Sequence, residues 1–148
     1  MIGLLLTAGA VMLTDVPGEQ PAQAAASDKA TEMKIRMRLE GRSITATLEE
    51  SAAARDFLSL LPLSLTLTDY NSTEKVADLP RKLSTAGAPT GVDPDVGDVA
   101  YYAPWGNLAI YYRDFGYSRG LVKLGRLDSG VEALSVRGPL RVTIERAE

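Results

Sequence analysis

The sequence predicts a mainly β protein, a barrel or a sandwich in which one short helix plugs an end. About seven short segments from residue 33 onward alternate apolar and polar residues or form brief apolar runs, as strands do. One segment alone has the three- and four-residue apolar spacing of a convincing helix. The chain has 148 residues, 45% of them hydrophobic, so it is long enough to bury a core. Many short strands around one helix are typical of a barrel or a sandwich.

The first hairpin is the clearest of these elements. Residues 33–40 place an apolar side chain at every second position, which predicts a half-buried strand. Residues 43–48 alternate in the same way, with Ile44, Ala46 and Leu48 on one face. Gly41 and Arg42 stand between the two segments, and we expect them to form a two-residue turn.

Residues 49–61 change to a helical period. Ser51 is a suitable N-cap, because its hydroxyl can accept a bond from a free backbone N–H of the first turn. Pro62 ends the helix, since the residue before a proline avoids the helical region, and residues 63–68 then alternate again as a strand. The apolar stripe of the helix consists of Ala53, Ala54, Phe57, Leu58 and Leu61.

The middle of the chain has little regular pattern. Residues 69–80 contain the turn signal Asn71-Ser72 and mixed charges, so we expect them to be irregular, with one helical turn over residues 81–83. Residues 84–96 read as a loop because glycine and proline recur in them. A loop of this length in a compact domain is usually functional or mobile.

Aromatic side chains gather in the next stretch, residues 97–112. It holds four of the six tyrosines and the only tryptophan. Residues 99–102 and 108–112 read as two strands. They are joined by a tight connection, because proline fixes its backbone while glycine and asparagine tolerate a positive φ. The connection consists of Pro104, Trp105, Gly106 and Asn107.

The last third of the chain adds two more strands. After a loop over residues 113–120, residues 121–127 form a strand in which Gly125 suggests a bulge or a close backbone contact. Residues 129–134 are expected to form a short helical turn. Residues 140–145 alternate and close the domain.

Composition excludes several classes of function. The chain has no cysteine and no histidine, so it has no disulfide, no histidine ligand and no Ser-His or Cys-His nucleophile. A net charge of −3 does not fit the basic face that nucleic-acid binding needs. Asp93, Asp95 and Asp98 lack the spacing and terminal glutamate of a calcium loop, and no glycine-rich phosphate loop is present. We therefore expect no metal, no cofactor and no nucleic-acid partner.

The N-terminal 32 residues read as a signal peptide and a flexible lead. Residues 2–13 are an uncharged apolar run that is too short to span a bilayer, and Ala22-Gln23-Ala24 has the form of a signal-peptidase site. We expect cleavage near Ala24–Ala26, a periplasmic or secreted protein, and no membrane span in the mature chain. No Lys or Arg precedes the run, so either the true start lies upstream or the signal is weak; a buried helix is the alternative.

A series of short motifs, in this order, resembles the bacterial cyclophilin-like domain proteins. The series starts with the Met-Lys-Ile strand at Met33 and the Ala-Ala-x-x-Phe helix. It continues through Asp69-Tyr70 with Glu74-Lys75, then Gly97-Asp98-x-x-Tyr-Tyr-x-Pro-Trp-Gly, and ends with Leu-Ala-Ile-Tyr-Tyr and Leu-Gly-Arg. The resemblance implies a closed cyclophilin-like β-barrel over residues 33–146, with the short helix capping an end. The function of that group is largely unassigned.

True cyclophilins isomerise X-Pro bonds, and this chain departs from their pattern. Their Phe-His-Arg-Val-Ile-like strand, Gln-Gly-Gly and Ser-Gln-Phe-Phe segments and late Trp and His are missing. A prolyl isomerase needs a guanidinium at the prolyl amide nitrogen beside an apolar pocket. Arg113, Arg119 and Arg126 offer cations, but nothing in the sequence places any of them.

The leading hypothesis is a binding module for a peptide or a small ligand in an aromatic groove, since pockets are mostly apolar with a few polar anchors. Cross-strand packing is the other explanation for the tyrosines, of which Tyr101 and Tyr102 must face opposite sides. A structural role of Asp98 as an acceptor at the strand entry is favoured over a catalytic one. The alternative functions are a peptidyl-prolyl isomerase with a non-standard site and an assembly partner with an exposed β edge. The candidate ligand-binding residues are Tyr70, Glu74, Asp98, Tyr102, Trp105, Tyr111 and Arg113.

Overall fold

The computed structural model of the chain describes residues 33–147. The predicted signal peptide and lead, residues 1–32, lie outside the described residues. Within the described range, no helix has both the length and the apolar character needed to cross a membrane.

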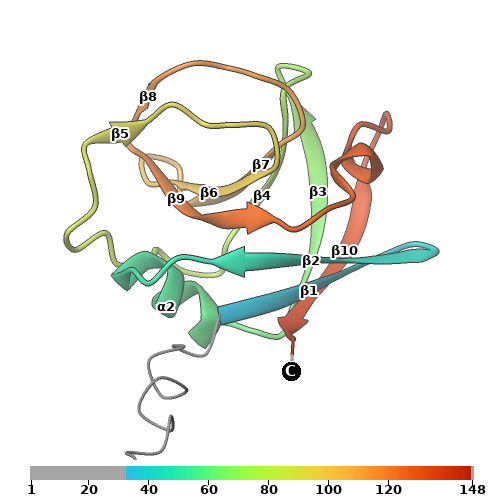
Figure 1. The fold of residues 1–148 in the computed structure, drawn as a ribbon, viewed down its shortest axis with the longest axis horizontal. Helices are drawn as coiled ribbons and strands as arrows, with labels where there is room; N and C mark the ends of the chain where they lie inside the picture. Colours follow the sequence, from blue (N-terminus) through green and yellow to red (C-terminus); the bar gives the residue numbers. More distant parts are fainter. Residues whose placement is uncertain (1–32, 148) are drawn as a thin grey trace, which may run out of the picture. The chain divides into compact units, whose positions relative to one another are not determined.

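Eight antiparallel strands form a closed barrel (Figure 1). Around the barrel the strands follow the order β1, β10, β3, β4, β7, β6, β9, β2, and β2 pairs with β1. A separate pair, β5 with β8, forms a two-stranded sheet. The elements are β1 (Met33–Leu39), β2 (Arg42–Leu48), α2 (Ala52–Ser59), β3 (Leu63–Tyr70), β4 (Glu74–Asp78), β5 (Gly91–Val92), β6 (Asp98–Tyr102), β7 (Asn107–Tyr111), β8 (Ser118–Arg119), β9 (Leu121–Leu127), the 3₁₀ helix η1 (Val131–Leu134) and β10 (Leu140–Arg146).

Within residues 33–147, the closed barrel with its one short α-helix confirms the predicted fold class. Closure pairs every strand of the eight-stranded sheet on both sides, and a barrel of this kind has no free edge. Among the described residues, an assembly partner that adds to an exposed β edge would therefore have to use the separate two-stranded sheet of β5 and β8.

Alternation along the strands fills the barrel with apolar side chains. In β1, for example, Ile35 and Met37 are fully buried while the intervening arginine is not. Helix α2 adds Phe57 to the same cluster from the connection between β2 and β3. Ser51 caps this helix as predicted, because its Oγ accepts the backbone N–H of Ala54 at 3.1 Å.

Strand β4 corrects the prediction that residues 69–80 are irregular. It pairs with β3 and with β7. Its charged neighbours Glu74 and Lys75 are both buried, at 5% and 0% exposure. Buried charges on both faces remove the apolar–polar alternation by which a strand is predicted from sequence, so its pattern did not stand out.

Two smaller predictions are also corrected. The hairpin turn consists of Glu40 and Gly41 rather than Gly41 and Arg42, because Leu39 pairs with Arg42; Gly41 adopts a φ of 77° there. Residues 81–83 do not form a helical turn. The bulge predicted at Gly125 is present, since the pairing of β9 with β6 shifts register between Val99 and Ala100.

A second apolar cluster lies on the outside of the barrel wall. Ala100, Ala109, Tyr111 and Leu121 are buried there and pack against Val92 of β5. The two long loops that carry β5 and β8 arch over β6 and β7 (Figure 1). The predicted loop over residues 84–96 therefore covers this wall, with only the two residues of β5 in regular structure.

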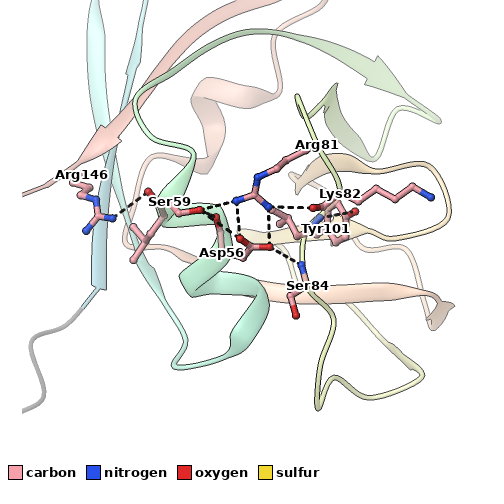
Figure 2. A network of polar contacts seen from close by, with 9 residues as sticks. Asp56, Ser59, Arg81, Lys82, Ser84, Tyr101 and Arg146 are labelled. Carbon is pink, nitrogen blue, oxygen red and sulfur yellow. Dashed lines mark hydrogen bonds and ion pairs between the residues drawn. The ribbon is translucent and has the colours of Figure 1, made fainter.

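A polar network ties α2 to the start of that long loop (Figure 2). The Arg81 guanidinium donates to both carboxylate oxygens of Asp56, at 3.0 and 2.7 Å, and to the Ser59 hydroxyl at 2.8 Å. Asp56 also accepts the backbone N–H of Ser84 at 2.7 Å. Nearby, the Tyr101 hydroxyl accepts the backbone N–H of Leu83 at 3.1 Å. These bonds hold the loop against the helix and the barrel.

The Asp56 network is expected to make stability depend on pH in acid. Hydrogen bonds from Arg81 and from the Ser84 backbone lower the pKa of Asp56 from 3.8 to about 2. A depressed carboxyl pKa stabilises the folded state above the unfolded pKa, and the contribution disappears as pH falls through the folded one. Wild-type protein should therefore lose more stability between pH 4 and pH 2 than Asp56→Asn, as measured by urea unfolding. Equal losses would contradict this, and Asp93→Asn serves as the exposed control.

Candidate functional site

A pocket opens on the outer wall of the barrel, beside the connection between β6 and β7. Its volume is about 150 Å³. Strands β4, β6 and β7, the turn after β3 and the segment that ends in β8 supply its walls. The lining residues are Tyr70, Asn71, Glu74, Val76, Tyr102, Trp105, Asn107, Ala109, Tyr111, Phe115 and Ser118.

Because side chains alternate along a strand, one tyrosine of Tyr101-Tyr102 and one of Tyr111-Tyr112 faces this pocket. Tyr102 and Tyr111 lie on the outer face and line it, whereas Tyr101 is buried in the barrel interior. Tyr112 points elsewhere and donates its hydroxyl to the Asp69 carboxylate at 2.7 Å. The connection with Trp105 thus lies beside an outer-wall pocket, not over the barrel interior.

Three aromatic rings form one side of the pocket. Trp105, the only tryptophan of the chain, is 58% exposed. Its ring lies 5.5 Å from that of Tyr70 and 5.2 Å from that of Tyr102, at interplanar angles of 84° and 88°. Edge-to-face contacts of this kind are favourable, so the two tyrosines hold an exposed tryptophan in place.

Glu74 supplies a buried carboxylate to the pocket. It lies on β4 directly opposite Tyr111 of β7, and the two side chains share a hydrogen bond. Burial raises the pKa of Glu74, and burial together with the bond to Glu74 raises that of Tyr111. Among the described residues, no Lys or Arg forms an ion pair with Glu74. Its neighbour Lys75 points into the barrel and pairs with Asp69 instead.

Asn107 brings a second acceptor to the same place. It begins β7, is only 6% exposed, and its Oδ1 has no hydrogen-bond partner within residues 33–147. A buried acceptor without a partner is costly. In this position a ligand that donates a hydrogen bond would satisfy it.

Two of the predicted site residues lie outside the pocket. Asp98 is buried at the start of β6, where its Oδ2 accepts the backbone N–H of Asp95 at 2.9 Å and its Oδ1 lies 3.4 Å from Lys123 Nζ. This is the structural role that the sequence favoured. The Arg113 guanidinium lies 5.9 Å from the centre of the Tyr112 ring. Neither Asp98 nor Arg113 lines the pocket.

The remaining five predicted residues come together: Tyr70, Glu74, Tyr102, Trp105 and Tyr111 all line the pocket. Sequence reasoning missed Asn107, which it assigned to the turn. Asn107, Ala109 and Tyr111 are spaced two residues apart on β7, and this spacing could have placed Asn107 on the same face as Tyr111.

The lining contains no arginine among the described residues, so Arg113, Arg119 and Arg126 all lie elsewhere. Nor does any group of three or more acidic residues within residues 33–147 have the arrangement to hold a metal ion. The pocket therefore combines aromatic surface with hydrogen-bond acceptors and a single carboxylate.

Replacing the pocket carboxylate is expected to increase stability. Because the pKa of Glu74 is raised in the folded state, its ionisation opposes folding once pH exceeds the ordinary value of 4.5, and stability falls as pH rises toward the folded pKa. Glu74→Gln removes this cost and retains an acceptor for the Tyr111 hydroxyl. The variant should melt a few degrees above wild type at pH 7 and match it near pH 4. A lower melting temperature at pH 7 would contradict the assignment.

The described residues thus form a closed antiparallel β-barrel with a small aromatic pocket on its outer wall. The sequence profile described as the Cyclophilin-like family matches residues 37–145. The chain therefore belongs to the cyclophilin-like family, as its motifs predicted.

One solved structure supports the fold. The chain is similar to the solution structure of the hypothetical protein AF2241 from Archaeoglobus fulgidus, with a TM-score of 0.59 and 20% sequence identity. The similarity covers 81% of this chain and 98% of that one. A search of curated proteins finds no match to the chain.

Proposed function

We propose that the outer-wall pocket binds a small ligand, either a free molecule or a side chain presented by a peptide. The observation that carries the proposal is the exposed Trp105, which Tyr70 and Tyr102 hold at the rim of a hollow with a buried carboxylate. A tryptophan needed only for packing would be covered by the core. Ligand pockets instead combine aromatic walls with a few polar groups.

The same lining does not favour prolyl isomerisation. That reaction needs a cation at the amide nitrogen of the substrate, and the described lining holds a carboxylate and no arginine. We therefore favour ligand binding over prolyl isomerisation as the function of this pocket.

Trp105→Ala is expected to weaken ligand binding by at least about tenfold, because tryptophan is among the residues whose truncation costs most in binding sites. Trp105 is the only tryptophan, so its fluorescence reports on the pocket alone. A panel of small amines, alcohols, carboxylates and short peptides would be screened with wild type by this emission and by NMR shifts of the backbone. Binding to Trp105→Ala, which contains no tryptophan, would be measured by the NMR shifts alone.

Val96→Ala is the matched control, since Val96 is exposed and lies outside the lining. It should bind each hit as wild type does. The proposal would be wrong if all hits shifted backbone signals elsewhere on the barrel, or if Trp105→Ala bound them unchanged.

A further inference from the structure

We infer that the group bound in this pocket is a small alkylammonium cation, with Glu74 as its counter-ion and the rings of Tyr70, Tyr102 and Trp105 around it. The inference rests on the proposed binding function and names the chemistry of the ligand. Nothing in the membership of the cyclophilin-like family assigns it.

The first argument is the charge of the lining. Glu74 is 5% exposed and no described cationic side chain pairs with it. A buried charge is normally paired, because leaving water without a counter-charge is costly. The one charged group of the lining is thus an acid, and Tyr111 offers it a hydroxyl but no charge. A cation from outside would complete the pair, whereas an anion would be repelled.

The second argument is hydrogen bonding. Asn107 Oδ1 is buried in the same pocket without a partner in the part of the chain that the structure describes. Glu74 and Asn107 come from neighbouring strands, β4 and β7. In this pairing Glu74 lies opposite Tyr111 and Asn107 opposite Asp78, so the two acceptors are four residues apart along the strands, about 13 Å. The ammonium group would bind at Glu74, and Asn107 Oδ1 would accept a hydrogen bond from a second donor of a longer ligand.

The third argument is the arrangement of the rings. The Trp105 ring lies nearly perpendicular to the ring of Tyr70 and to that of Tyr102, and all three residues line the pocket. Aromatic boxes bind ammonium groups because the negative face of each ring attracts a cation. The attraction is strongest for tryptophan, which is the most exposed of the three.

The fourth argument is size. About 150 Å³ is well below the roughly 300–1,000 Å³ of pockets that enclose drug-sized ligands. The pocket therefore accepts one end of a molecule or a compact ion. A free amine and the side chain of lysine both present such an end.

The test compares three probes of equal length: n-butylammonium chloride, 1-butanol and sodium butyrate. Trp105 fluorescence and backbone NMR shifts are recorded at constant ionic strength and pH 8. We expect the ammonium ion to bind at least about tenfold more tightly than the alcohol, which corresponds to about 1.4 kcal/mol, and butyrate to bind most weakly. Nα-acetyl-lysine amide, whose only amine is that of its side chain, is then compared with n-butylammonium. Tighter binding of the lysine derivative indicates a peptide side chain as the ligand, and tighter binding of n-butylammonium indicates a free amine.

Two variants assign the effect to the carboxylate. Glu74→Gln should lose the preference of ammonium over alcohol, while its fold is verified by its NMR spectrum. Glu40→Gln alters an exposed acid in the first hairpin turn and should retain the full preference. Equal binding of alcohol and ammonium by wild type, or an unchanged preference in Glu74→Gln, would overturn the inference.

The inference and the binding proposal fail differently. If neutral or anionic compounds bind with a Trp105-dependent signal and amines do not, the ammonium assignment is wrong and the pocket still binds ligands. If no compound of any charge perturbs Trp105 or the strands around it, both are wrong.

Discussion

Lys75→Ala should lower the melting temperature by roughly 10 °C, a loss of about 3 kcal/mol for a domain of this size. The Lys75 side chain is fully buried in the barrel. Its ammonium donates to the carbonyls of Val136 and Gly138 at 2.7 and 2.9 Å and lies 3.0 Å from Asp69 Oδ1. The alanine variant leaves these acceptors without their donor and adds a cavity. We take the low end of the range for a broken buried pair because Asp69 is 34% exposed and water can reach it.

Two further variants separate the charge from the packing. Lys75→Met keeps most of the side-chain volume, so a large loss in this variant as well would assign the effect to the polar contacts. Lys82→Ala truncates an exposed lysine and should change stability by less than about 0.5 kcal/mol. Thermal unfolding followed by circular dichroism measures all three. A Lys75→Met protein as stable as wild type would show that the contacts contribute little.

Gly125→Ala is expected to cost about 3 kcal/mol by steric conflict alone. A Cβ at this position would stand 2.3 Å from the carbonyl oxygen of Thr47 and 2.7 Å from Leu48 Cα. Both atoms are backbone of β2, so neither can swing away as a side chain can. The strands β2 and β9 would have to separate at the bulge, where Gly125 also pairs with Val99 of β6.

Gly87→Ala is the control for the general effect of adding a methyl group. Gly87 has a φ of 74° and nothing within 4 Å of its added Cβ, so only the strained backbone, about 1 kcal/mol, is at stake. Urea unfolding should give Gly125→Ala a much lower free energy of unfolding than Gly87→Ala. The reverse order would mean that β2 and β9 adjust at the bulge without cost.

The neighbours Glu74 and Lys75 show how one strand serves both the fold and the site. Successive side chains of a strand point to opposite faces, so Lys75 is buried on the barrel side of β4 while Glu74 faces the outer pocket. From the sequence we expect this pair in an irregular segment with its side chains pointing apart, which does not say which of the two faces the barrel interior. Pairing of β4 with both β3 and β7 decides this.

Most of the fold could be predicted from local patterns. The hairpin of β1 and β2, the Ser51-capped helix, the aromatic hairpin and β9 with its glycine bulge all follow from periodicity, capping and turn residues in the sequence. Alternation also required that one tyrosine of each pair face outward. These features depend on residues close together in the chain, so the sequence states them directly.

The tertiary structure alone decided which residues meet. Trp105 contacts Tyr70 from the far end of β3, and the carboxylate beneath them comes from a strand that no periodicity marked. It also separated Asp98 and Arg113 from the pocket, although both flank the aromatic hairpin in sequence. The physical reason is that barrel closure fixes the register between strands distant in sequence, and this register determines which side chains share a face of the wall.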